Sequence, residues 1–213
     1  MYIIKRMPET AAAALESEFD PVNLPVGFAG LDRAGISFYP WDTNGYRPEA
    51  CAWMGWNAQG LHVLMASFEP VIRKEVYVTG GPVCRDSCLE CFLMPAPALT
   101  SAYINIEATP AAVMHIGIGE GRHGRDVYTE LPDEFVAFAS QHAGGWWAVS
   151  YTIPAALLRE RFGAELRPGA KMRGNFYKCG DLTAFPHYGM WHPYDLPAPD
   201  FHRPELFGDF ILE

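Results

Sequence analysis

The amino-acid sequence predicts an all-β fold, an antiparallel β-sandwich of the immunoglobulin-like or jelly-roll-like kind with one or two short helices. Two observations lead to this prediction. Apolar and polar residues alternate with period two over much of the chain, and glycines and prolines separate the alternating segments as turn residues do. An α/β enzyme would need several amphipathic helices, and only one segment has convincing helical spacing.

The predicted strands follow one another from residue 34 to residue 212. Each is a short run rich in apolar and aromatic residues with turn residues on both sides. The segments are 34–41, 50–56, 60–69, 85–94, 101–108, 111–119, 145–153, 170–179 and 206–212.

One helix is predicted within residues 154–166, opened by Pro154 and broken by Gly163. Leu157, Leu158 and Phe162 share one side of it. A second, weaker helical pattern covers residues 10–19.

Composition indicates one globular domain over residues 1–213, because 49% of the residues are hydrophobic and no repeat or linker interrupts the chain. The net charge of -9 disfavours nucleic acid and anionic lipid surfaces as partners. The sequence contains no run of about 18 apolar residues, the length that would predict a membrane span. The first residues also lack the apolar core of a signal peptide, so we expect a cytoplasmic protein, or an extracellular or periplasmic one if a leader was removed.

The segment CRDSCLECFL has the C-x3-C-x2-C spacing with which radical S-adenosylmethionine enzymes hold a four-iron cluster. As a strand, however, it would turn Cys88 and Cys91 to opposite faces, which argues against a shared cluster. Buried free thiols are the alternative that we favour. Cys88 shares its face with polar residues and can lie near Cys179, and the alternation leaves open whether these two thiols pair.

Three predicted strands are apolar on one face and polar on the other, which predicts one continuous, open polar sheet surface. Carboxylate, amide and guanidinium groups suit the hydroxyls of a neutral saccharide, and aromatic rings suit its C–H faces. The polar positions are Asp86, Glu90, Asn105, Glu107, Arg173, Asn175 and Tyr177.

Candidate aromatic platforms for a sugar ring include Trp191, whose neighbours Gly189 and Pro193 indicate a loop. Further candidates are Tyr188, Tyr194, Trp41 and Trp56, while Trp53, Trp146 and Trp147 lie in strand patterns that favour the core.

Catalysis by these carboxylates is the less favoured alternative, and no catalytic residue is predicted. Asp86 and Glu90 would lie roughly 13 Å apart along a strand, farther than a glycosidase pair requires. Glu90 and Glu107 could come nearer, but on an open sheet nothing would raise the pKa of an acid. If the protein is an enzyme, we expect a hydrolase of O-glycosyl bonds.

Five pieces of the sequence together give it a family likeness: DSCLECFL, YINIEA, RGNFYKCGD, HYGMWHP and PDFHRPELFGDFIL. In this order they resemble the carbohydrate-binding module family 9-like group of the DOMON-like sandwich superfamily, over roughly residues 60–213. The resemblance implies a β-sandwich that binds a mono- or oligosaccharide on a concave face. It also implies a place in carbohydrate catabolism, because such modules often accompany glycoside hydrolases.

The resemblance also implies roles for particular residues. Glu90 would bind sugar hydroxyls together with Asn105, Glu107 and Asn175, and Trp191 would form one wall of an aromatic clamp. No Trp stands where the family places the second wall, so Phe68 or Tyr77 is a possible substitute.

Some consequences of the resemblance stay open. Phe201, His202, Pro204 and Glu205 either pack the last strand or join the site. The family's calcium is structural, and this chain has no dense Asp/Asn loop of the calcium type, so its metal content is unknown. Other members of the superfamily suggest a haem or cofactor site, for which Met65, Met114 and His115 are candidates, and a ligand-free interaction domain is a further alternative.

Overall fold

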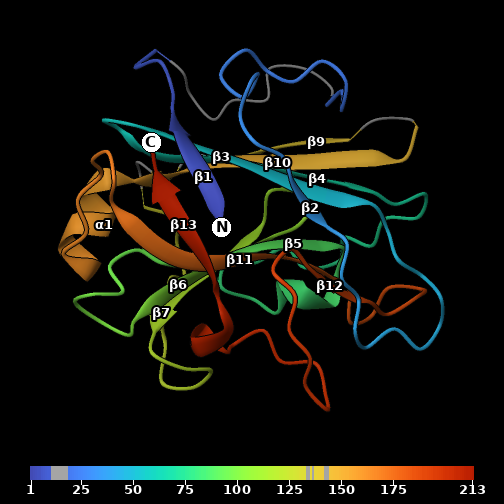
Figure 1. The fold of residues 1–213 in the computed structure, drawn as a ribbon. Coiled ribbons are helices and arrows are strands. Elements are labelled where there is room, and N and C mark those ends of the chain that lie inside the picture. The colour runs from blue at the N-terminus through green and yellow to red at the C-terminus, as the bar shows by residue number, and fades with distance from the viewer. Residues whose placement is uncertain (11–18, 133–134, 136, 142–143) are drawn as a thin grey trace.

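The structure is a computed structural model that describes residues 1–10, 19–132, 135, 137–141 and 144–213. Two β-layers pack face to face and enclose the main core (Figure 1). The second predicted helix, at residues 10–19, falls almost wholly outside the described residues. Within the described part of the chain, no helix is long and apolar enough to cross a membrane.

The strands of the described residues carry the labels of Figure 1, and two 3-10 turns and one helix complete the structure. The strands are β1 (Tyr2–Arg6), β2 (Ala34–Ile36), β3 (Ala50–Asn57), β4 (Gly60–Phe68), β5 (Cys88–Met94), β6 (Tyr103–Ala108), β7 (Met114–Gly119), β8 (Asp126–Val127), β9 (Ala137–Gln141), β10 (Trp146–Pro154), β11 (Lys171–Cys179), β12 (Tyr188–Met190) and β13 (Gly208–Leu212). The helical elements are η1 (Val83–Arg85), α1 (Ala155–Phe162) and η2 (Pro204–Leu206).

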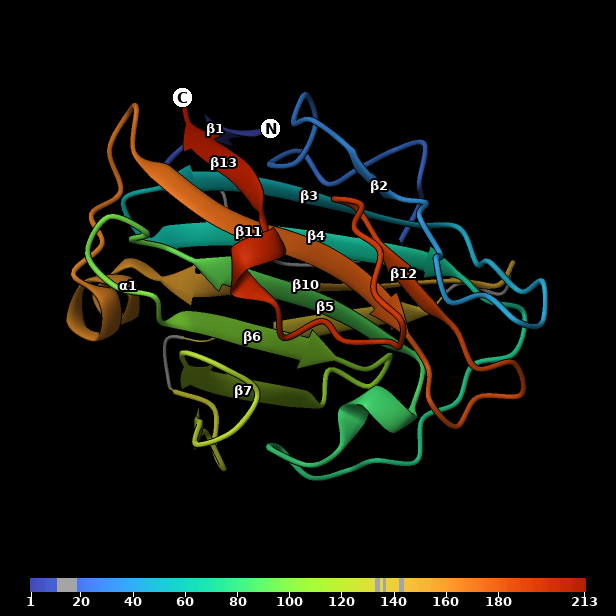
Figure 2. The ribbon, with the colours of Figure 1, turned by 60° about the horizontal axis from the view of Figure 1, so that its bottom comes forward.

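The first layer has the order β3-β4-β10-β9, with β2 on the other edge of β3, and the second has the order β8-β7-β6-β5-β11-β13 (Figure 2). Strand β1 joins them, because its first residues pair with β13 and its last with β3. Both pairings are parallel, and the other strand pairs are antiparallel. The predicted β-sandwich is thus confirmed, but as a mixed sheet curled into a half-barrel.

The core between the layers follows from the alternation of the strands. Leu89, Cys91 and Leu93 of β5 point into it, as do Ile104 and Ile106 of β6. Cys88 belongs to a separate apolar cluster on the other face of the same sheet, so Cys88 and Cys91 do diverge as predicted. Met65 and Met114, the candidates for haem ligation, both lie in the core between the layers.

Helix α1 begins after Pro154 and ends at Phe162, as the sequence predicts. Gly163 has a φ of 68°, a left-handed conformation that suits glycine, and its backbone N–H bonds to the Arg159 carbonyl. Leu157, Leu158 and Phe162 bury the inner side of the helix at the edge of the core.

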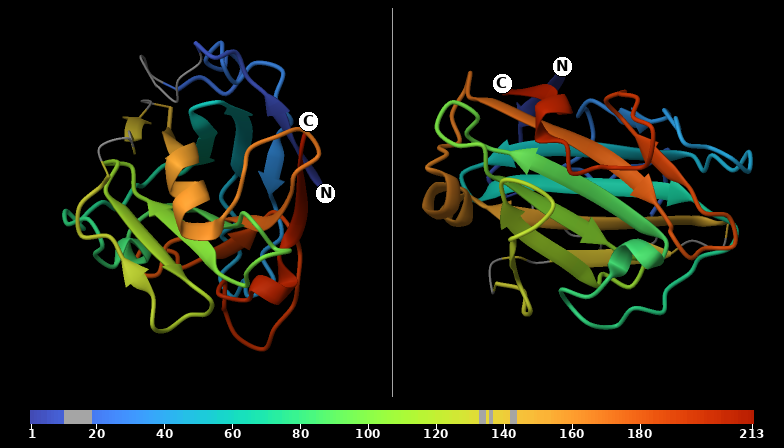
Figure 3. Two further views of the ribbon diagram at one scale, coloured as in Figure 1. Left: turned by 90° about the vertical axis from the view of Figure 1, so that its left-hand side faces the viewer. Right: turned by 90° about the horizontal axis from the view of Figure 1, so that it is seen from below.

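The outer face of the second layer, the one turned away from the first layer, is covered. Between β12 and β13 the chain runs across it as residues 191–207, which we call the covering segment (Figure 3). Phe201 and Phe207 of this segment pack onto Phe92 and Tyr177. The prediction of an open polar surface is therefore wrong, since Glu90 is only 2% exposed.

Candidate functional site

The polar residues of the three predicted strands do share the outer face of the second layer. In the sheet register Glu90 of β5 lies between Tyr177 of β11 and Glu107 of β6, and Glu107 is followed by His115 of β7. The neighbouring row places Asn175 and Asn105 on either side of Phe92. Alternation with period two is the cause, because each strand contributes every second side chain to this face.

A pocket of about 220 Å³ opens between this face and the covering segment. Three of the predicted site residues, Glu90, Glu107 and His202, line it. The remaining lining residues are Cys84, Phe92, Arg122, Cys179, Asp181, Tyr188, Pro199, Asp200 and Phe201. The pocket therefore combines carboxylates, aromatic rings and thiols.

The Glu107 carboxylate is held by a chain of hydrogen bonds. Asn105 Nδ2 donates to Glu107 Oε1 at 2.8 Å, and Arg125 Nε donates to Asn105 Oδ1 at 2.9 Å. The Arg125 guanidinium also lies over the Tyr103 ring, 4.1 Å from its centre. Asn105 thus orients Glu107 from below the pocket surface, because both groups of its amide are occupied.

His202 connects the covering segment to the sheet. Its Nδ1 lies 2.7 Å from the Tyr103 hydroxyl, and its ring centre lies 4.9 Å from that of Phe92. Burial and the charges of Arg122 and Arg125 lower the pKa of His202 to about 4. A neutral imidazole therefore faces the pocket at neutral pH.

Glu90 and Glu107, the two glutamates of the pocket lining, both have a raised pKa. Burial raises the pKa of Glu90 well above its ordinary value, and the neighbouring Glu107 carboxylate adds to the effect. Burial also raises the pKa of Glu107, although His115 and Asn105 oppose the shift. The expectation that nothing here would raise the pKa of an acid is wrong, because the covering segment and the residues before β5, among them Val76, Val83 and Cys84, remove the strands from solvent.

Four other predicted residues have structural contacts outside the pocket lining. Asp86 accepts hydrogen bonds from the backbone N–H groups of Glu75 and Val76, both at 2.7 Å. Asn175 exchanges two hydrogen bonds with the backbone of His192, and Arg173 donates to the backbone carbonyls of Glu205 and Phe207. Tyr177 stacks on Phe201 with 4.0 Å between ring centres. These contacts hold the loops in place around the pocket.

Trp191 packs beside the core rather than in the pocket lining. Its ring contacts Tyr2, Phe176 and Phe210, with centre-to-centre distances of 5.9, 6.1 and 5.4 Å. Phe68 and Tyr77, the alternatives for the second wall of a clamp, are likewise absent from the pocket lining. The aromatic rings that do line it come from Phe92, Tyr188 and Phe201.

Some of the lining residues that were not predicted as site residues carry partial signals in the sequence. Phe92 lies two residues from Glu90 and so shares its face of the strand, and Tyr188 is one of the predicted aromatic platforms. Arg122 and Asp200 join two loops by an ion pair of 2.6 Å, and no pattern in the sequence links these loops. Potential metal-ligand atoms lie close together in Cys88, Glu90 and Cys179. Structural calcium stays a prediction.

The curled β-sandwich and its pocket of carboxylates and rings define a protein of the carbohydrate-binding-module class. The model of carbohydrate-binding family 9 matches residues 25–212, and the chain belongs to this family. A search of curated proteins gave no match.

Solved structures share the fold at low sequence identity. The chain is similar to a proposed carbohydrate-binding protein from Bacteroides uniformis, with a TM-score of 0.81, 24% identity, and coverage of 99% of this chain and 98% of that one. It is also similar to a family 9 carbohydrate-binding module from Caldicellulosiruptor kristjanssonii. The complex with glucose has a TM-score of 0.63, 13% identity, and coverage of 99% and 95%. The complex with cellotriose has a TM-score of 0.62, 12% identity, and coverage of 100% and 93%.

Proposed function

We propose that the protein binds a mono- or oligosaccharide in the pocket between the second layer and the covering segment. The observation that carries the proposal is the neighbouring pair of carboxyl groups, Glu90 and Glu107, on a pocket floor that also presents the Phe92 ring. Carboxylates accept hydrogen bonds from vicinal hydroxyls, and aromatic rings pack on the C–H face of a sugar. Asn105 supports this role through Glu107, because it fixes the carboxylate orientation.

The size of the pocket restricts what enters it. At about 220 Å³ it is smaller than the roughly 300–1,000 Å³ of sites for drug-sized ligands. We infer that one sugar residue enters, either as a monosaccharide or as the end of an oligosaccharide. The glucose and cellotriose complexes of the Caldicellulosiruptor module make glucose and cello-oligosaccharides the first ligands to test.

Isothermal titration calorimetry against glucose, xylose and their oligosaccharides tests the proposal. Wild-type protein should bind at least one of them, and Glu107→Gln should lower the affinity by about tenfold or more, because a charge-assisted hydrogen bond is worth roughly 1.5–3 kcal/mol. Glu165→Gln, at an exposed position outside the pocket, is the matched control and should bind like wild type. Absence of binding across the panel, or an equal loss in both variants, would refute the proposal.

Hydrolysis of O-glycosyl bonds is a second candidate, supported by the raised pKa values of two carboxyl groups that lie opposite each other across β5 and β6. Glycoside hydrolysis needs a protonated acid beside an ionised carboxylate. Chromogenic glucosides and xylosides separate the candidates. Turnover that Glu90→Gln and Glu107→Gln each abolish would favour the enzyme, and binding without turnover would favour the module.

The proposed role is in carbohydrate catabolism, in association with glycoside hydrolases that release or process the bound sugar. We propose the cytoplasm as the compartment, supported by five cysteines that are all free thiols. Immunodetection in fractions of the native cell tests the compartment, and recovery of the protein outside the cytoplasm would contradict it.

A further inference from the structure

Two thiols and a carboxylate converge at the floor of the pocket. Cys88 of β5 and Cys179 of β11 are direct partners in the sheet register. The Cys179 thiol donates a hydrogen bond of 2.8 Å to Glu90 Oε1. The two sulfur atoms and a carboxylate oxygen of Glu90 lie within 4.8 Å of one another.

This spacing is close to that of a metal's ligand shell. Ligands about 2.3 Å from a tetrahedral ion are roughly 3.8 Å from each other, so the three atoms need to close up by at most about 1 Å. The three side chains reach the same point from two adjacent strands in fixed register, which limits the rearrangement to side-chain rotation. All three residues are buried, and Glu90 and Cys179 line the pocket.

The charges around the three residues favour a cation. Glu90 is 2% exposed, and its carboxylate lies beside Glu107 in the register. Asp181 adds further negative charge, while Lys178, the cation that acts on Glu90, already pairs with Glu69 at 3.2 Å. Within the described residues, no ion pair involves Glu90 itself. Burial of acidic groups without a cation is unfavourable, and a divalent ion would remove that cost.

The ligand set selects the kind of ion. Thiolates prefer Zn²⁺ and similar soft or borderline ions, whereas Ca²⁺ and Mg²⁺ prefer oxygen ligands. We propose that Cys88, Cys179 and Glu90 form a binding site for a thiophilic divalent cation of the Zn²⁺ class, with its fourth coordination position open toward the pocket. The site shares Glu90 with the proposed saccharide pocket, but the observations that support it do not rest on saccharide binding. It also differs from the cluster spacing in the sequence, because Cys91 points into the other core.

Titration of the reduced, chelator-treated protein with Co²⁺, as a spectroscopic substitute for Zn²⁺, tests this proposal. The expected result is one equivalent of Co²⁺ with thiolate-to-metal charge-transfer absorption, displaced by Zn²⁺. Loss of a direct ligand should weaken binding by more than about 100-fold in Cys88→Ser and Cys179→Ser. Cys91→Ser and Cys51→Ser are matched controls, because these cysteines are equally buried and belong to other clusters.

Glu90→Gln removes a ligand with almost no change of shape and should also weaken Co²⁺ binding. If a serine variant does not fold, alkylation of the wild type followed by mass spectrometry decides the question. Zn²⁺ should then protect Cys88 and Cys179 from the reagent without changing the reaction of Cys91 or Cys51. Absence of the charge-transfer band, its survival in Cys179→Ser, or protection that omits Cys88 and Cys179 would overturn the proposal.

Discussion

Lys178 and Glu69 form an ion pair that is buried at one end of the sandwich, with 3.2 Å between Lys178 Nζ and Glu69 Oε2. Alternation turns Lys178 away from the pocket, because its neighbours Tyr177 and Cys179 point to the outer face. The carboxylate of Glu69 also accepts hydrogen bonds from Trp147 Nε1 at 2.6 Å and from Ser87 Oγ at 3.2 Å. The pair thus joins β11 to β10 and to the loop before β5.

Lys178→Met should destabilise the protein strongly. It leaves the Glu69 carboxylate buried without its cation, which costs about 3–5 kcal/mol in comparable pairs. Urea denaturation measures the loss, and Lys171→Met, at an exposed position on the same strand, should cost far less. The double variant Lys178→Met/Glu69→Gln should recover part of the stability, and the proposed role of the pair fails if all three variants unfold at the same urea concentration.

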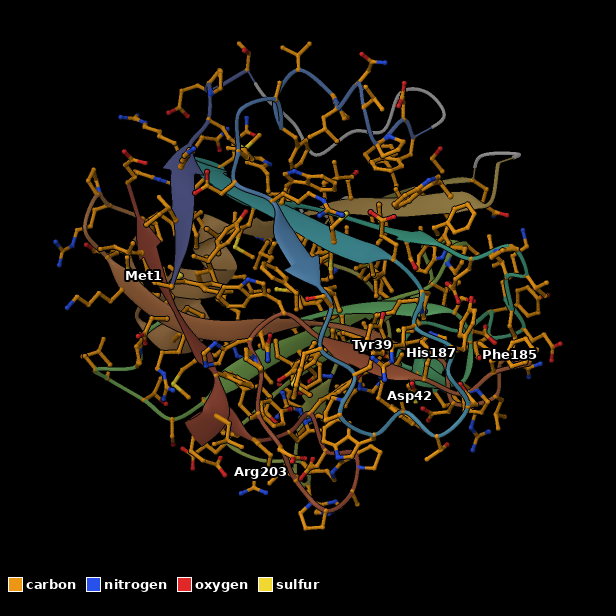
Figure 4. The ribbon with its side chains drawn as sticks, turned by 45° about the vertical axis from the view of Figure 1, so that its right-hand side comes forward. Met1, Tyr39, Asp42, Phe185, His187 and Arg203 are labelled. Atoms are coloured by element: carbon orange, nitrogen blue, oxygen red, sulfur yellow. The ribbon has the colours of Figure 1, made fainter. Side chains whose placement is uncertain are left out.

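Stability should fall in acid because of His187, which lies at the same end of the molecule as Phe185 (Figure 4). His187 Nε2 lies 2.8 Å from Lys178 Nζ, and its Nδ1 lies 2.7 Å from the Phe185 carbonyl oxygen. Burial, with a smaller effect from the Lys178 charge, lowers the pKa of His187 from 6.5 to about 3. Between these values the unfolded chain binds a proton that the folded chain does not, so acid favours unfolding.

Below pH 6.5, His187 alone lowers the free energy of unfolding by up to about 1.4 kcal/mol for each pH unit. This dependence stops near the pKa of His187 in the folded protein, where the folded chain also binds the proton. Urea midpoints at pH 7, 6, 5 and 4 measure it in wild type and in His187→Gln. The variant should have the shallower slope and a smaller stability at pH 7, since it loses the contact with Lys178. Parallel slopes in the two proteins would show that His187 does not carry the acid sensitivity.

The sequence predicted the long strands well, because their alternation is sustained and each buries one complete face. It missed β1, where only Tyr2 and Ile4 are deeply buried, and it also missed β8, β9 and the three residues of β12. Short strands carry too few alternations to show a period, and the parallel pairing of β1 depends on partners near residues 55 and 211. The mixed character of the sheet therefore could not be predicted.

The candidate site was predictable as a face but not as a pocket. The alternation of side chains along each strand predicted that Glu90, Asn105 and Glu107 share one face, and the sheet register confirms that arrangement. Whether such a face is open depends on the path of the covering segment, which no local pattern specifies. The orientation of Trp191 was unpredictable for the same reason, because a loop residue has no fixed side.

Trp191→Ala should act on stability rather than on saccharide affinity. Its ring packs with Tyr2, Phe176 and Phe210, and removal of a large aromatic side chain from such a site costs roughly 3 kcal/mol. Tyr188→Ala, on the pocket wall, should instead weaken saccharide binding by about fivefold, because stacking contacts of this kind are worth on the order of 1 kcal/mol. Urea denaturation and calorimetry on both variants check this contrast. A loss of affinity in Trp191→Ala together with a loss of stability in Tyr188→Ala would contradict it.

Gly117→Ala should weaken saccharide binding without touching the pocket surface. A Cβ atom at this position of β7 would lie 2.7 Å from Asn105 Oδ1 and 3.0 Å from Arg125 Nε. The two groups must separate to admit it, which breaks the chain of hydrogen bonds that orients Glu107. We expect about a tenfold loss of affinity, since one hydrogen bond to a charged group contributes roughly 1.5 kcal/mol or more. Gly121→Ala, where a Cβ would meet nothing within 4 Å, is the matched control. If both variants bind sugar as tightly as wild type, the orientation of Glu107 by Asn105 is not required for binding.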